Sequence, residues 1–198
     1  MSTRKTNPQL VFVWVVALLV FALSVAGFVF LLQDSSVTEV ERDHADFRTK
    51  YASAPDDHIF RTLSAKEADS MIERGHGVLF LGFPECPWCQ TLVPHLDASA
   101  KDMAIAEIQY FDIRQDRADD TELYQKFVEK LEPYLDQGED GKPRIFVPNV
   151  VILRNGEVVG NYKIELPESD EPVTPQTYWN DETIATTRAK LRQIMSEL

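Results

Sequence analysis

The stretch "GVLFLGFPECPWCQ", Gly77 to Gln90, contains both cysteines of the 198-residue chain, separated by two residues. Residues 77–83, "GVLFLGF", form an unbroken apolar run that is bounded by glycine and by Pro84, which is typical of a strand buried on both faces. After Cys86, Pro87 suits the first turn of a helix, because the N–H that proline lacks would have no partner there. The sequence therefore predicts a buried strand, a short loop and a helix that begins at the cysteine pair.

Helical and extended patterns alternate on both sides of this stretch. "SAKEADSMIERG" predicts a helix, because Ser64 and Glu67 form a capping box and Gly75 is a natural stop. "IFVPNVVILRNGEVVGNYKIEL" predicts two strands joined at Asn155-Gly156, a strong hairpin signal. Further strands are expected near residues 59–63 and 104–113, and further helices over residues 120–136 and 181–195. This order predicts an α/β domain whose central mixed sheet, mainly parallel with antiparallel strands at its end, is flanked by helices.

The N-terminal part of the chain carries a long apolar segment. Residues 10–32 contain no charged side chain and would span roughly 34 Å as a helix, enough to cross a membrane. We interpret them as an uncleaved transmembrane helix, although a cleavable signal peptide is the alternative. Residues 1–9 would then be a cytoplasmic tail, because Arg4 and Lys5 lie on that side. Residues 33–57 are expected to form a stalk, and residues 58–198 an extracytoplasmic domain.

The chain has a formal net charge of -12, with 32 acidic and 20 basic residues. Such a surface repels phosphate backbones, so nucleic acid is not an expected partner. The predicted compartment matters for the cysteines, because disulfides persist outside the cytoplasm and are reduced inside it.

Two cysteines at the start of a helix are placed for thiol chemistry. The helix N-terminus offers unpaired N–H groups and a partial positive charge, both of which favour a thiolate at Cys86. Cys89 lies one turn later and could resolve a mixed disulfide formed by Cys86. Trp88 could shield the sulfurs or offer a substrate an apolar surface. A redox pair that uses no cofactor is therefore the favoured hypothesis.

A structural role and a metal-binding role are the alternatives for the pair. A structural disulfide that closes so small a loop would add little stability. A metal site needs two further ligands, and the nearest histidine, His95, is half a turn out of phase with Cys86 on a helix. No metal ligand set is therefore assigned.

The segment "VLFLGFPECPWCQTLVPHLDASA" resembles the active-site region of the thioredoxin superfamily, in which a strand, a loop and C-x-x-C precede a helix with a proline. Pro94 holds that proline position, and Asp97 follows as in many thioredoxins. The segment from Ile145 to Gly160 is similar to the part of those proteins that contains a cis-proline. The resemblance covers roughly residues 58–198 and implies a thioredoxin-like fold, a cis-Pro148 beside the cysteines, and a Val147 backbone that pairs with a substrate strand.

The sequence also departs from the family. Many thioredoxins carry a buried acid six residues before the first cysteine, and Phe80 stands there instead. Glu85 directly precedes Cys86, and its charge would oppose thiolate formation unless it points to solvent. Residues 120–144 lengthen the stretch before Pro148 and suggest a family-specific insertion. Short membrane-tethered thioredoxin-like proteins of the bacteriocin-accessory type resemble this layout.

The resulting hypothesis is a membrane-anchored, extracytoplasmic thiol-disulfide oxidoreductase that acts on protein thiols and disulfides. Cys86 and Cys89 would be catalytic, and Trp88, Val147 and Pro148 would bind the substrate. The membrane, through residues 10–32, and a membrane electron donor or acceptor are further expected partners. Oxidase, isomerase and reductase share these parts, so the sequence leaves the direction open. A non-enzymatic binding or assembly module and a metal-delivery protein are the alternatives.

Overall fold

A computed structural model of the chain describes residues 14, 21, 41–169 and 171–198. The predicted span, residues 10–32, lies outside the described residues apart from Trp14 and Phe21. In the described part of the chain, no helix is both long enough and apolar enough to cross a membrane.

A five-stranded mixed sheet forms the centre of the fold, in the order β1-β3-β2-β6-β7. The first three strands in that order are parallel, β6 runs antiparallel to β2, and β7 runs antiparallel to β6. The strands are β1 (Phe60–Thr62), β2 (Gly77–Gly82), β3 (Ile108–Asp112), β6 (Asn149–Arg154) and β7 (Glu157–Lys163). The structure thus confirms the predicted mixed sheet, and the cysteines follow its central strand.

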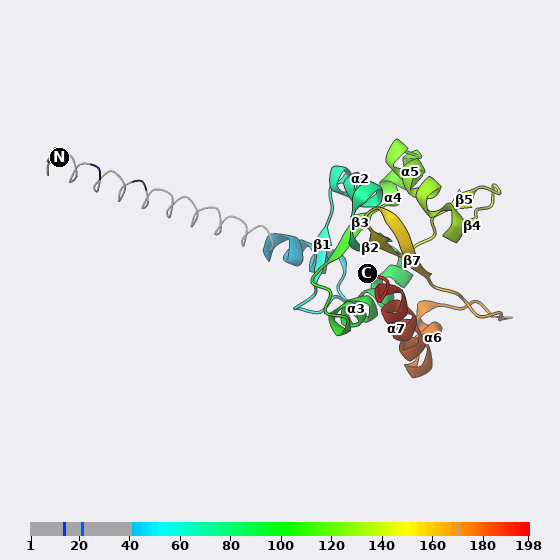
Figure 1. The fold of residues 1–198 in the computed structure, drawn as a ribbon. Helices are drawn as coiled ribbons and strands as arrows, with labels where there is room; N and C mark the ends of the chain where they lie inside the picture. Colours follow the sequence, from blue (N-terminus) through cyan, green and yellow to red (C-terminus); the bar gives the residue numbers. More distant parts are fainter. Residues whose placement is uncertain (1–13, 15–20, 22–40, 170) are drawn as a thin grey trace, which may run out of the picture. The chain divides into compact units, whose positions relative to one another are not determined.

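Helices cover both faces of this sheet (Figure 1). One face is covered by α3 (Pro87–Asp102) and α7 (Asp181–Met195), and the other by α2 (Ala65–Arg74) and α5 (Glu122–Leu131). Successive side chains of a strand point to opposite faces. Val78 and Phe80 therefore pack in the α3 and α7 layer, whereas Leu79 and Leu81 pack in the α2 and α5 layer. Burial on both faces explains why β2 is an unbroken apolar run.

Two predicted local signals are confirmed in detail. Ser64 caps α2 with a reciprocal capping box to Glu67, and Gly75 ends the helix. Asn155 and Gly156 both have positive φ, 54° and 82°, as a tight turn between β6 and β7 requires. A Cβ on Gly156 would lie 2.1 Å from the Glu73 carbonyl oxygen, so the hairpin also needs glycine for its close approach to α2.

The stretch between β3 and β6 differs from the prediction. Instead of one helix over residues 120–136, the chain forms α4 (Arg114–Asp119), α5 and a short 3-10 helix (Glu132–Tyr134). The α-helix ends at Leu131 because Pro133 has no N–H to donate to the carbonyl four residues earlier. Residues 137–144, predicted as a loop, contribute to a small hairpin of β4 (Asp136–Gln137) and β5 (Pro143–Arg144).

The compact unit that contains the sheet begins at Asp43, earlier than the boundary predicted at residue 58. Residues 41–50 are helical, and Phe47 and Tyr51, one helical turn apart, are fully buried in the main core. The Phe47 ring stacks on Phe60 with centroids 4.6 Å apart. Residues 43–57 therefore form part of the domain, because these two aromatic side chains complete its core.

Candidate functional site

The cysteine pair lies where β2 ends and α3 begins. Cys86 is the N-cap of α3, and its Sγ accepts the backbone N–H of Cys89 at 3.4 Å. The first N–H groups of a helix have no partners within the helix. They form stronger hydrogen bonds with a thiolate at the N-cap than with a neutral thiol, so this position stabilises the ionised form of Cys86. In its thiol form Cys86 donates to the Val147 carbonyl oxygen at 3.7 Å.

The two thiols have different acidities. The pKa of Cys86 is lowered to about 6, chiefly because the Cys89 thiol donates a hydrogen bond to it, with further help from backbone N–H groups of Cys89 and Trp88. Burial raises the pKa of Cys89. Cys86 is 8% exposed, whereas Cys89 is fully covered. Cys86 is thus both the ionised sulfur and the one that a second molecule can reach.

Glu85, which could have opposed thiolate formation, points toward solvent and pairs with Arg114. Both side chains are about half exposed, and the Arg114 guanidinium holds the pKa of the Glu85 carboxyl below its usual range. The Glu85 charge is therefore balanced by Arg114, the first residue of α4.

Arg117, on α4, is a charged residue of the site that sequence reasoning missed. Its guanidinium carbon lies 5.1 Å from the centre of the Phe83 ring, and it donates to the Ile145 carbonyl oxygen at 3.4 Å. Its positive charge contributes to the lowered pKa of Cys86. No motif marks this residue, because α4 was not predicted and only the fold brings it to the cysteine loop.

Aromatic side chains share the buried core that contains the inner thiol, Cys89. A Cβ on Gly82 would lie 3.1 Å from the Cys89 sulfur and 2.8 Å from the Phe80 ring, so glycine makes room for both. The hydroxyl of Tyr51 donates to that of Tyr110 at 3.3 Å in the same core. Burial raises the pKa of both phenols. Position 80 therefore offers no carboxylate that could accept a proton from Cys89.

The helix behind the pair continues through Pro94. Proline cannot donate to the carbonyl four residues earlier, which belongs to Gln90, and the Ser53 hydroxyl donates to that oxygen instead. Asp97 is buried on the same helix, where it accepts the Ile59 N–H at 2.9 Å and pairs with Lys101 at 2.8 Å. Both features fasten α3 to the segment that precedes β1.

The residues predicted to bind substrate lie together beside Cys86. The Val147-Pro148 peptide bond is cis, as the resemblance to the thioredoxin superfamily implied. Trp88, Val147 and Pro148 line one groove of about 400 Å³. Phe146 and Leu166, which the sequence analysis did not single out, line the same groove.

A further aromatic group flanks the motif. The rings of Trp88 and Tyr178 meet edge to face with centroids 5.5 Å apart, and Trp179 packs on His95 at 4.8 Å. Tyr178 ends α6 (Pro175–Tyr178), a short helix that was not predicted. His95 is thus part of an aromatic contact on the outer side of α3.

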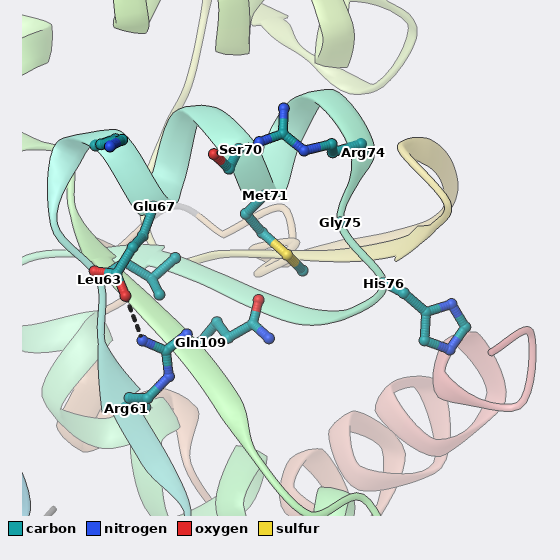
Figure 2. A pocket seen from close by; sticks show the side chains of 10 residues that line it. Arg61, Leu63, Glu67, Ser70, Met71, Arg74, Gly75, His76 and Gln109 are labelled. Atoms are coloured by element: carbon teal, nitrogen blue, oxygen red, sulfur yellow. Dashed lines mark hydrogen bonds and ion pairs between the residues drawn. The ribbon is translucent and has the colours of Figure 1, made fainter. Parts of the chain in front are cut away.

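A second hollow lies far from the cysteines, at the end of the sheet where β2 begins. Figure 2 shows its lining, in which Arg61 points toward Glu67 from β1. Arg61 pairs with Glu67 at 2.9 Å and with Glu107 at 3.0 Å. Because Arg61 is already paired and no cysteine lines this hollow, we place the candidate site at Cys86.

Among the described residues, no group of three or more His, Cys, Asp and Glu side chains is arranged to hold a metal ion.

Comparisons of the chain with models of protein families, with curated proteins and with solved structures found no match.

Proposed function

We propose that this protein is a membrane-anchored, extracytoplasmic thiol-disulfide oxidoreductase with a thioredoxin-like domain. The observation that carries the proposal is the pairing of two unlike thiols. Cys86, slightly exposed at the start of α3, has a pKa lowered to about 6, and Cys89 lies buried one turn behind it. The mixed sheet with helices on both faces and the cis-Pro148 beside the pair support the resemblance on which the rest of the proposal rests.

The exchange proceeds through a mixed disulfide. The Cys86 thiolate attacks one sulfur of a substrate disulfide, and the other sulfur leaves as a thiolate. Cys89 then loses its proton to solvent or to the departing thiolate and attacks the Cys86 sulfur, which releases the second substrate thiol. The substrate gains two electrons, the Cys86–Cys89 pair becomes a disulfide, and the reverse sequence oxidises a dithiol substrate. A membrane electron donor or acceptor would restore the starting state.

Two single variants of the full chain in detergent test this proposal. Cys86→Ser should abolish reduction of insulin disulfides, because no attacking sulfur remains. Cys89→Ser should accumulate mixed disulfides that are visible on a non-reducing gel, because the resolving sulfur is missing. His76→Ser serves as the control, since His76 is exposed and lines the distant hollow. Full insulin reduction by Cys86→Ser would refute the proposal, whereas unchanged biological activity of a variant with both cysteines replaced by serine would favour a non-enzymatic binding module.

Two further measurements test the predicted membrane anchor and the direction of electron transfer. Alkaline extraction of membranes should leave the chain in the pellet if residues 10–32 anchor it, and release of the chain would contradict the anchor. The equilibrium of the pair with glutathione gives its reduction potential, which distinguishes a reductase from an oxidase.

A further inference from the structure

The chain has four histidines, of which only His58 is fully buried, at 1% exposure. It lies shortly before β1, and its ring stacks on that of His44 with centroids 4.3 Å apart. His44 belongs to the helix over residues 41–50, and Phe47 of the same helix packs on the His58 ring with centroids 4.9 Å apart. No step of the proposed exchange uses His58. A buried histidine makes the structure around it sensitive to pH, because its charge changes near neutral pH.

Both ring nitrogens of His58 form hydrogen bonds, and the backbone decides which of them carries the proton. The Phe60 N–H can only donate, so Nδ1, 3.1 Å away, is the acceptor and carries no hydrogen. The hydrogen of the neutral ring is therefore on Nε2, which donates to the His44 carbonyl oxygen at 3.2 Å. One bond joins the ring to β1, and the other joins it to the preceding helix. Only the neutral ring can form both.

Protonation of His58 removes an acceptor that the fold uses. The charged ring carries a hydrogen on each nitrogen, so Nδ1 would face the Phe60 N–H as donor against donor. A buried donor without a partner is costly. Burial also disfavours the charge itself and lowers the pKa of His58. The attached structure therefore disfavours the charged ring.

The charged and titratable groups around His58 come from two helices. His44 and Asp43 lie on the helix before β1, and Asp97 lies on α3. Both carboxylates would attract a cation, but both have other partners. Asp43 accepts a backbone N–H of β1 at 2.9 Å, and Asp97 pairs with Lys101 at 2.8 Å. A charged His44 would repel a charged His58, since the two rings are stacked.

The segment that His58 attaches to β1 also contacts the core and the cysteine helix. We call residues 43–57 the strap. Phe47 and Tyr51 of the strap are fully buried in the core, and the Ser53 hydroxyl donates to the Gln90 carbonyl oxygen on α3. In the sheet, β1 is an edge strand that pairs only with β3. Release of the strap would therefore uncover this edge and free the start of α3.

We infer that acid releases the strap from β1 and that His58 is the group that takes up the proton. This inference goes beyond the proposed function and does not depend on it. The ring is protonated easily only in the released state, where it reaches water and titrates near the ordinary histidine pKa of about 6.5. Because the pKa is lower in the attached state, the strap is held fully above about pH 6.5 and is held less firmly as the pH falls below that value.

Hydrogen–deuterium exchange of the full-length reduced protein in detergent, between pH 7.5 and pH 5, tests the inference. Exchange in peptides from residues 43–62 is corrected for the pH dependence of the chemical step, which leaves the equilibrium between attached and released strap. This equilibrium should shift about 30-fold toward release, the limit for one group with a pKa of about 6.5 that is charged only when released. Peptides from β6 should keep their protection, because they report on unfolding of the whole domain.

Histidine variants locate the response. In His58→Asn, the asparagine oxygen can accept the Phe60 N–H two residues later but takes up no proton in this pH range. Its strap should be released more often at every pH, because the ring is lost, but the equilibrium should hardly depend on pH. His44→Asn should keep most of the response, since His44 contributes a backbone carbonyl to the bond. His76→Asn, the same change at an exposed histidine, should keep all of it.

The outcomes are distinct from those that test the cysteines. A shift of less than about threefold in the unmodified protein would overturn the inference, given the 30-fold expected from one proton. An equal response in His58→Asn, or its loss in His44→Asn, would also overturn it, because another group would then take up the proton. Parallel loss of protection in β6 would overturn it as well, since acid would then unfold the whole domain.

Discussion

Alkylation of Cys86 by iodoacetamide should occur at pH values where a free cysteine hardly reacts. With a pKa of about 6, Cys86 is about 9% thiolate at pH 5, whereas a free cysteine with a pKa of about 8.5 is about 0.03% thiolate. The lower pKa also makes each thiolate roughly tenfold less nucleophilic. The net advantage is therefore about 20-fold at pH 5 but only about twofold at pH 7. The inflection of the rate against pH, rather than a single rate at neutral pH, is the decisive observable.

The assay follows carboxamidomethylation of the reduced protein by mass spectrometry between pH 4 and 9. The first cause of the lowered pKa is the hydrogen bond from the Cys89 thiol. Cys89→Ala removes that donor and should move the inflection to higher pH, whereas Cys89→Ser keeps a hydroxyl donor and should move it less. An inflection near 8.5 in the unmodified protein, or no difference between Ala and Ser, would refute the reasoning.

The ionisation of Cys86 also makes the stability of the reduced protein depend on pH. The pKa of Cys86 is lower in the folded reduced protein than in the unfolded chain, so its thiolate stabilises the fold fully above about pH 8.5 and loses that effect as the pH falls through about 6. The Tm of the reduced protein relative to Cys86→Ala should therefore decrease between pH 8.5 and pH 5. A difference that stays constant over this range would contradict a lowered pKa.

Three further predictions concern the surrounding fold. Phe47→Ala should lower the free energy of unfolding of the full chain by about 3–5 kcal/mol in urea titrations, because the side chain is fully buried, whereas Asp46→Ala, which changes an exposed residue, should stay within about 0.5 kcal/mol. Gly156→Ala should cost about 2 kcal/mol or more in the same titration, since φ is 82° and the new Cβ would meet the Glu73 carbonyl; an unchanged midpoint would argue against that turn. Arg117→Gln should raise the pKa of Cys86 and shift the alkylation inflection upward, and an unshifted inflection would show that the guanidinium does not act on the sulfur.

The elements that the sequence predicts well are those with a strong local cause. The capping box at Ser64 and the turn at Asn155-Gly156 depend on a few neighbouring residues, and both are found where expected. The run over residues 77–83 predicts a strand buried on both faces because every residue in it is apolar or glycine, and the observed strand, β2, is Gly77–Gly82. The alternation of helices and strands and the terminal hairpin predict a sheet with both parallel and antiparallel strands, but the order of the strands across the sheet is known only from the structure.

The missed features depend on contacts between distant segments. Arg117 reaches the site only because α4 follows β3, the neighbour of β2 in the sheet. The groove residues Phe146 and Leu166 are separated by the whole β6–β7 hairpin, and no spacing in the sequence links them. Phe47, in the polar helix over residues 41–50, and Tyr51, directly after it, are too few to produce a clear periodic signal.

Tyr51 and Ser53 show that the segment before β1 takes part in the site. The Ser53 hydroxyl and the Lys50 carbonyl both bond Gln90, the residue directly after Cys89. Tyr51 packs against Phe80 and Tyr110 in the core that also contains Cys89. The helix that carries the two cysteines is therefore held partly by residues 50–53, which precede β1.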